Sequence, residues 1–265
     1  MKFLPSFLHS FTMGWLGAWQ QKTALVSLVV SYLIGKGLWV SVWTMVPDVT
    51  LARLGLGYDQ IIWYAVLTGC VNYPLVRAYR VIEEDIHTGA LGSFLSRPVG
   101  HVTLRLGEAV GGALLRAAVL APFAVLFSVL VTGTWLLSGW AIPAWILSVA
   151  LGIVLWTLLH MLIGFSASWM RSARPVFMLV GKGVLVLGGV IMPISLYPGW
   201  VQTLAWSTPF PAMLYIPAHW TLETVSLSSA LTGLSVQLFW IVLTGTALAL
   251  ASCMAEQRFI RRGGA

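Results

Sequence analysis

Long apolar stretches alternate with short polar ones along most of the chain. Six of them are apolar over about the 20 residues that a helix, rising about 1.5 Å per residue, needs to cross a hydrocarbon core about 30 Å thick. The pattern therefore predicts six transmembrane helices. They lie at about residues 23–46, 60–78, 109–132, 142–167, 175–194 and 231–253.

The first 22 residues carry a different apolar pattern. Aromatic side chains recur at every fourth position with polar side chains between them, which is typical of an amphipathic helix lying in the membrane interface. These aromatic residues are Phe3, Phe7, Phe11, Trp15 and Trp19. A signal peptide is the alternative, but Pro5 and the polar residues interrupt its apolar segment and no A-x-A-like cleavage site follows. We predict an interfacial helix over residues 1–22.

Residues 195–228 are apolar but contain prolines at a density that forbids one continuous helix. The prolines are Pro198, Pro209, Pro211 and Pro217. A broken segment at membrane depth is tolerated only where protein or a water-lined cavity satisfies its backbone. We therefore predict a broken re-entrant or interfacial helix pair on the extracytoplasmic side, and no seventh crossing.

The composition strengthens the membrane interpretation. Hydrophobic residues make up 58% of the chain and charged residues only 9%, whereas soluble proteins carry about a quarter charged residues. The net charge of +7 comes from basic residues scattered at the ends of apolar stretches, so it does not indicate a nucleic-acid partner. The chain is predicted to be one all-α polytopic membrane domain over residues 1–265, with no soluble catalytic domain.

The basic residues also predict the orientation in the membrane. One side of the predicted bundle would hold eleven of them and the loops of the other side only Arg53, so the positive-inside rule places both termini in the cytoplasm. The eleven are Lys2, Lys22, Arg77, Arg80, Arg97, Arg105, Arg171, Arg174, Arg258, Arg261 and Arg262.

The sequence argues against catalysis by this chain. A phosphate-binding P-loop needs G-x-x-x-x-G-K-[ST], and the Gly-Lys pairs that end at Lys36 and Lys182 lack both the upstream glycine and the following Ser or Thr. Cys70 and Cys253 have no metal-ligand spacing. We expect no ATP hydrolysis, no metal and no cofactor in this chain.

Two polar residues fall inside predicted spans and are candidates for a translocation pathway. Lys36 lies about 21 Å along a helix from Lys22, so we expect it to face protein or a water-filled cavity. His160 is near the middle of the fourth predicted span and has no second histidine there to complete a haem or metal site. A helix-to-helix hydrogen bond is the alternative role for His160.

The most polar stretch of the chain, residues 80–98, follows the second predicted span. Its acidic start at Glu83 suits a helix N-terminus, where the macrodipole favours negative charge. The residues that would share one face of a short helix are Ile86, Ala90, Phe94 and Leu95. Such a helix, held parallel to the membrane, could dock a soluble partner, and a solvated loop is the alternative.

The same stretch resembles the cytoplasmic motif of permeases of the type-two ATP-binding-cassette (ABC) exporter family. The residues that match are Glu83-Glu84, Gly89, Leu91, Phe94-Leu95 and Arg97-Pro98. A second block is similar to the end of span five and the broken helices of a bacterial subgroup of that family. It comprises Gly188-Gly189, Ile191-Met192-Pro193-Ile194, Pro198-Gly199-Trp200, Pro209-Phe210 and Tyr215-Ile216-Pro217. The basic tail from Arg258 to Gly264 also fits, so the resemblance covers nearly the whole chain.

The resemblance implies a permease of the bacterial inner membrane that exports a hydrophobic or amphipathic compound. Residues 1–22 would form an elbow helix, residues 80–98 a coupling helix against an ATPase, and residues 195–228 a cap on the pathway. The residues implied in ATPase coupling are Glu83, Glu84, Asp85, Gly89, Leu91, Phe94, Leu95 and Arg97. MgATP would bind to two copies of a separate ATPase, and the chain would pair with itself or with a sister permease.

Two other classes of protein remain as alternatives. An ion-coupled secondary transporter would use Lys36 or His160 as its titrating group, but the spans contain no Asp or Glu at the midplane. An intramembrane enzyme would need a nucleophile with a base, or a metal cluster, and His160 stands alone.

Overall fold

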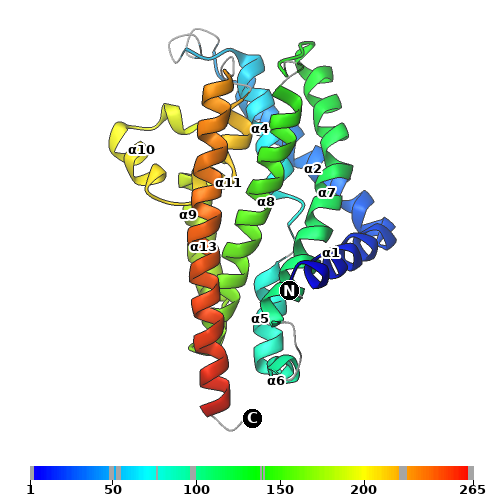
Figure 1. Ribbon diagram of the computed structural model, residues 1–265. Coiled ribbons are helices and arrows are strands. Elements are labelled where there is room, and N and C mark those ends of the chain that lie inside the picture. Colours follow the sequence, from blue (N-terminus) through cyan, green and yellow to red (C-terminus); the bar gives the residue numbers. More distant parts are fainter. Residues whose placement is uncertain are drawn as a thin grey trace.

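The computed structural model describes residues 3–47, 51, 55–75, 77–95, 100–137, 139, 141–220 and 226–261. Every regular element in these residues is a helix, which confirms the predicted all-α class (Figure 1). The helices are α1 (Phe3–Gln20), α2 (Lys22–Trp43), α4 (Tyr58–Asn72), α5 (Ala78–His87), α6 (Ala90–Leu95), α7 (His101–Thr132), α8 (Ala141–Phe165), α9 (Arg174–Leu187), α10 (Gly199–Trp206), α11 (Phe210–Met213), α12 (Tyr215–His219) and α13 (Leu227–Arg261), with short 3₁₀ turns η1 (Ser166–Ser168) and η2 (Ile194–Leu196).

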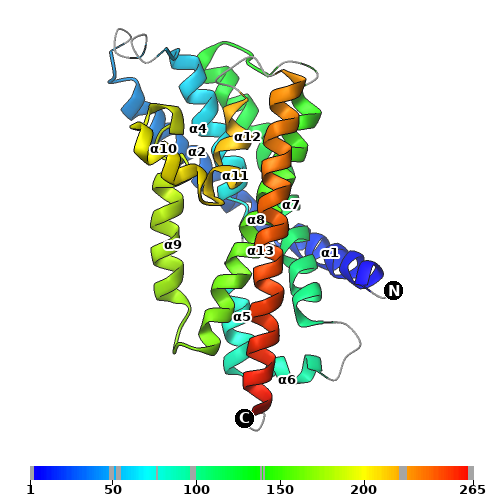
Figure 2. The same cartoon turned by 60° about the vertical axis from the view of Figure 1, so that its left-hand side comes forward.

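Four helices are long and apolar enough to cross a membrane: α2, α7, α8 with its extension through η1, and α13. Three of these, α7, α8 and α13, run along the long axis of the molecule (Figures 1 and 2). The short helices α5 and α6 and the C-terminal end of α13 lie at one end of the bundle, and the start of α13 and the end of α7 lie at the other. Four of the six predicted spans therefore have a helix of sufficient length.

The other two predicted spans are shorter than the sequence pattern suggests. α4 has 15 residues and α9 has 14, so at 1.5 Å per residue each covers about 21–23 Å of a core about 30 Å thick. α4 ends at Asn72. Tyr73 still has helical dihedral angles, but Pro74 has no backbone N–H with which to continue the helix. After α9 the chain turns at Gly189, whose φ of +75° lies in the left-handed region that glycine adopts readily.

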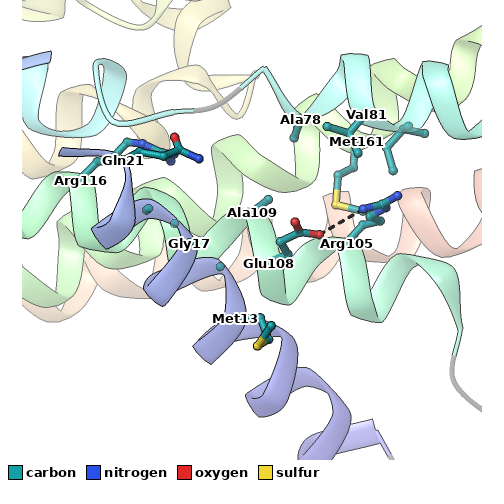
Figure 3. A pocket seen from close by; sticks show the side chains of 14 residues that line it. Met13, Gly17, Gln21, Ala78, Val81, Arg105, Glu108, Ala109, Arg116 and Met161 are labelled. Carbon is teal, nitrogen blue, oxygen red and sulfur yellow. Dashed lines mark hydrogen bonds and ion pairs between the residues drawn. The ribbon is translucent and has the colours of Figure 1, made fainter. Parts of the chain in front are cut away.

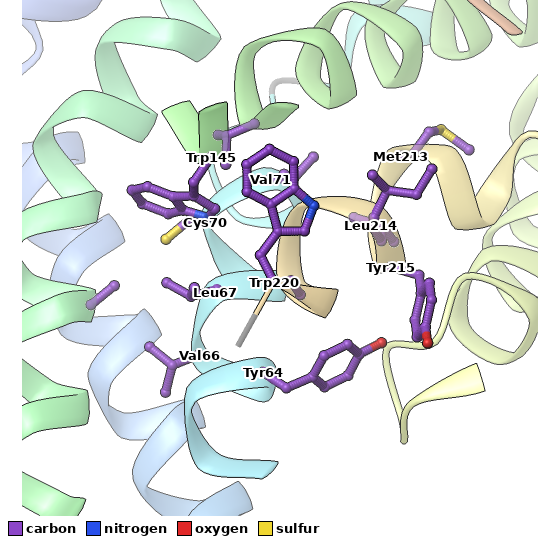
Figure 4. Packing of buried hydrophobic residues seen from close by; sticks show 14 of the residues in the cluster. Tyr64, Val66, Leu67, Cys70, Val71, Trp145, Met213, Leu214, Tyr215 and Trp220 are labelled. Carbon is purple, nitrogen blue, oxygen red and sulfur yellow. The ribbon is translucent and has the colours of Figure 1, made fainter. Parts of the chain in front are cut away.

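The core forms around α4, which is buried on every side from Ile61 to Val71. A helix that is apolar all round is stable only inside a bundle. Figure 4 shows Tyr64, Leu67 and Cys70 of α4 among Trp145, Leu214, Tyr215 and Trp220 from α8 and the region of α11 and α12. The Tyr64 hydroxyl donates a hydrogen bond of 2.6 Å to the Gly189 carbonyl, which ties α4 to the turn after α9.

The proline-rich region is divided into η2, α10, α11 and α12, as its prolines predict. α11 and α12 are buried, whereas α10 exposes Trp200 and Trp206. Gln237 of α13 supplies a hydrogen-bond donor to the backbone of this broken region. Its side-chain NH₂ donates to the carbonyl of Ala212 in α11 and also to the carbonyl of Ser148 in α8, each at 2.9 Å. A polar side chain inside the bundle thus takes the place of a missing helical hydrogen bond.

The N-terminal helix α1 lies across the direction of α7 in both views (Figures 1 and 2). The two backbones touch at glycines: a Cβ on Gly107 would come 2.7 Å from the Phe7 carbonyl oxygen, and one on Gly111 would overlap the Phe11 carbonyl. Large apolar side chains of α1 that do not contact α7 are exposed, among them Leu4, Leu8, Leu16 and Trp19. A transverse helix with these exposed side chains is compatible with the predicted interfacial position.

Candidate functional site

The polar stretch after α4 forms two short helices, and not the single helix starting near Glu83 that the sequence suggests. α5 begins at Ala78, so its acidic residues occupy its second half, away from the positive end of the helix dipole. The chain then turns at Gly89, whose φ of +73° places it in the left-handed region, and α6 follows. Phe94 and Leu95 belong to α6, and Arg97 lies outside the described residues.

Asp85 joins α5 to the start of α7. Its two carboxylate oxygens accept hydrogen bonds from Arg105, with Oδ1 2.7 Å from Nη2 and Oδ2 2.8 Å from Nε, and Oδ2 also lies 2.7 Å from Nε2 of His101. Burial by itself would raise the pKa of the Asp85 carboxyl, but these hydrogen bonds and the guanidinium charge outweigh it and hold the pKa below its ordinary value. Asp85 is therefore a buried carboxylate fixed in its charged form by two residues of α7.

Glu83 makes a second connection, to the start of α9. Its Oε1 accepts a hydrogen bond of 3.0 Å from the backbone N–H of Ala173, the residue that precedes α9, and lies 3.9 Å from Nε2 of His87. Because the first N–H groups of a helix have no partner within the helix, a carboxylate there satisfies one of them. Glu84, the next residue, is exposed to solvent.

The same short element packs against α8 and α13. A Cβ on Gly164 of α8 would lie 2.8 Å from the carbonyl oxygen of Tyr79 and 2.7 Å from Cβ of Ile82, so the two helices approach closely at this glycine. On α6, Leu91 is buried and Gly92 lies against the ring of Phe259 on α13. The α5–α6 element, residues 78–95, is thus connected to α7, α8, α13 and the start of α9.

Lys36 is buried in the bundle, as its depth along α2 predicts. Its Nζ lies 2.5 Å from the carbonyl oxygen of Ala65 on α4, and its stem packs against Gly69. It also lines a cavity of about 190 Å³ together with Thr68, Asn72 and Tyr73. Lys36 therefore lies against protein and beside a cavity, and its place in a translocation pathway stays a prediction.

His160 lies elsewhere, in a cluster of aromatic rings that joins three helices. Its ring centroid is 4.2 Å from that of Trp156, 5.5 Å from that of Phe177 on α9 and 6.1 Å from that of Tyr79 on α5. The structure therefore does not bring His160 together with Lys36, which lies against α4. Among the described residues no group of three or more His, Cys, Asp or Glu side chains could hold a metal ion.

A further cavity, of about 270 Å³, lies where α1 crosses α7 beside α5 and α8 (Figure 3). Its lining includes Arg105, Glu108 and Arg116 of α7, and the ion pair of Arg105 with Glu108 measures 3.2 Å. Arg116 falls near the start of the predicted span at residues 109–132, and the apolar pattern of that span does not indicate this cavity. Glycines spaced by four residues, Gly107 and Gly111, are the local signal of the helix crossing that forms it.

Comparison with models of known protein families shows to which family the chain belongs. Residues 55–264 match the family model described as ABC-2 family transporter protein, which is most of the chain. The chain belongs to this ABC-2 family. Among curated proteins and solved structures, no match was found.

Membership of the ABC-2 family confirms the resemblance drawn from the cytoplasmic and proline-rich motifs. An ABC-2 permease is a membrane component of a transporter and is not itself the ATPase, with which such permeases normally work. The matched range contains the whole α5–α6 element, whereas α1 and α2 precede it.

Proposed function

We propose that this ABC-2 permease is the transmembrane subunit of an ATP-driven exporter, and that the α5–α6 element is the surface that its ATPase partner contacts. The observation that carries the proposal is the set of connections of this element: Asp85 to α7, Glu83 to the start of α9, and Ile82 to α8. The element lies at one end of the bundle, so a soluble partner can reach it (Figure 2).

These connections explain how a displacement of the α5–α6 element would be transmitted to the helices of the bundle. A bidentate arginine–carboxylate pair fixes both distance and orientation, so α7 must follow α5 or lose a buried ion pair. A ligand shifts a two-state equilibrium only through contacts that differ between the states. Closure of two ATPase copies on MgATP would supply such contacts at Glu84, which is exposed, and at Arg97 of the predicted motif.

The assembly and the orientation of the transporter are inferred from the sequence. Two permease chains, identical or sister, would assemble with the two ATPases in a bacterial inner membrane, with both termini in the cytoplasm because the basic residues gather on that side. Lys36 would line the path of a hydrophobic or amphipathic cargo, since it is a buried cation beside a cavity. His160 would act by packing between α8, α9 and α5, in its cluster of rings.

The proposal is tested by co-expressing the chain with candidate ATPases, purifying it in mild detergent and assaying ATP hydrolysis in the complex. We expect a P-loop ATPase at a one-to-one ratio, and lower permease-dependent hydrolysis when Glu84→Ala and Arg97→Ala are combined. Glu256→Ala on α13 is the matched control, because it removes an acidic residue near the same end of the bundle from a different helix. A chain that purifies without any ATPase, and transports under an ion gradient alone, would instead be a secondary carrier.

A further inference from the structure

The cavity between α1 and α7 combines an apolar lining with the guanidinium of Arg116, for which the described part of the chain supplies no counter-charge. Four helices contribute to its wall: Gly17 and Ala18 from α1, Val81 from α5, Ala109 from α7 and Met161 from α8. The small residues of α1 leave the volume open, and a Cβ on Gly17 would meet nothing within 4 Å. The cavity is therefore wide enough for part of a ligand at the crossing of a transverse helix with a membrane-spanning one.

Its two arginines differ in their partners. Arg105 donates to both Asp85 and Glu108, so its charge is balanced within the protein. Arg116, about three turns further along α7, has no hydrogen bond or ion pair with another of the described residues, and its Nη1 is buried against Gly112. A partly buried guanidinium without an acceptor is unfavourable, which favours an anionic ligand at this position.

Figure 3 shows how these groups are arranged. Arg116 and Gln21 lie together at one end of the cavity, and the Arg105–Glu108 pair lies at the other. Because Glu108 is paired with Arg105, the end formed by Arg116 and Gln21 offers hydrogen-bond donors and a positive charge. Lys22 follows directly, with its Nζ 3.3 Å from the ring centroid of Trp19, and adds a second positive charge to the junction of α1 and α2.

We propose that this cavity binds an anionic phospholipid, with the headgroup phosphate on Arg116 and Gln21 and the first acyl carbons along Gly17, Ala18 and Met161. Guanidinium groups bind phosphate oxygens in a fork, and basic pockets between membrane helices are suited to acidic lipid headgroups. The exposed apolar face of α1, with Leu16 and Trp19, lies on the helix that forms one wall, so acyl chains have an apolar surface next to the site. Lipid binding in this cavity requires neither the ATPase nor the exported cargo.

The test uses the purified full-length chain in detergent, with lipids added as phosphatidylglycerol or phosphatidylcholine and bound lipid counted by native mass spectrometry. We expect the chain to retain phosphatidylglycerol over phosphatidylcholine. Arg116→Gln should reduce that preference about tenfold, or about 1.4 kcal/mol, because it removes the charge that binds the phosphate. Arg174→Gln is the matched control: it removes an exposed arginine at the start of α9 and should leave the preference unchanged.

A second variant keeps the charge and removes the space. Gly17→Leu should fill the cavity and reduce retention of phosphatidylglycerol while Arg116 remains, so the proposal stays testable if Arg116→Gln does not fold. The last measurement is the binding of glycerol 3-phosphate, which has the phosphate but no acyl chains. If it binds in an Arg116-dependent way and phosphatidylglycerol does not, the ligand is a soluble phosphate and the lipid assignment is wrong. Equal lipid retention by the wild type, Arg116→Gln and Gly17→Leu would also overturn the proposal.

Discussion

Asp85 of α5 and Arg105 of α7 form a bidentate ion pair, with both nitrogen-to-oxygen distances between 2.7 and 2.8 Å. The two residues are 20 positions apart in the chain, and Asp85 is 5% exposed. The pair therefore fixes the short helix at one end of the bundle to a helix that is long enough to cross the membrane.

Removing one member of this pair should destabilise the protein. Asp85→Ala would leave a guanidinium without its buried partner, which costs about 3 kcal/mol when a buried pair is broken. We expect a lower midpoint of thermal unfolding in detergent. Glu108→Gln is the control, because it removes the other carboxylate of Arg105 and leaves the connection between α5 and α7 intact. Equal losses in the two variants would contradict the role of Asp85.

The same carboxylate predicts how stability depends on pH. Because the pKa of Asp85 is lowered in the folded protein, its contribution is fully present above about 3.9, the ordinary pKa of Asp in an unfolded chain. It is lost as the pH falls through the lowered folded-state pKa. Unfolding midpoints measured from pH 6 downward should therefore fall more steeply in the wild type than in Asp85→Asn, and parallel curves would exclude this contribution.

The sequence predicted the fold best where apolar residues continued over long distances. α2, α7, α8 and α13 follow the predicted spans, and the breaks after residue 195 follow the prolines. α4 and α9 are shorter, because Pro74 and Gly189 end them inside stretches that are still apolar.

The candidate site was less predictable because its geometry depends on distant residues. The acidic run from Glu83 indicates a helix start by its local pattern, yet Asp85 and Glu83 pair with residues 16–90 positions away. No local pattern encodes such pairs. The burial of Lys36 could be predicted, since it needs only the depth of one residue along one helix.

The contact of α1 with α7 predicts sensitivity to small increases in volume. Gly111→Val would place a branched side chain against the Phe11 backbone, and overpacking of this kind costs about 1–3 kcal/mol. We expect faster proteolysis of α1 and a lower unfolding midpoint. Gly17→Ala, on α1 and facing open space, should leave both unchanged. Intact protection of α1 in Gly111→Val would show that the contact is looser than the structure indicates.

Lys36 offers a way to separate transport from stability. Lys36→Met removes a buried charge that donates a hydrogen bond to the Ala65 carbonyl, so no opposite charge is left unpaired and stability should change by less than about 1 kcal/mol. If Lys36 lines the cargo path, efflux of an amphipathic fluorescent dye from proteoliposomes should fall while the unfolding midpoint is kept. Lys182→Met, at an exposed position of α9, should change neither. Normal efflux by Lys36→Met would assign the residue a purely structural role.

Gln237 should be more important to stability than its place in a long apolar helix suggests. It donates to the Ala212 and Ser148 carbonyls and accepts from the Ser148 hydroxyl at 3.0 Å, so Gln237→Leu removes three hydrogen bonds and leaves buried polar groups unsatisfied. Each such group costs about 1–3 kcal/mol, and we expect the midpoint of thermal unfolding to fall accordingly. Gln257→Leu, near the exposed end of the same helix, should stay within about 0.5 kcal/mol of the wild type. If both variants unfold like the wild type, the broken helices α11 and α12 do not depend on α13 for their backbone hydrogen bonding.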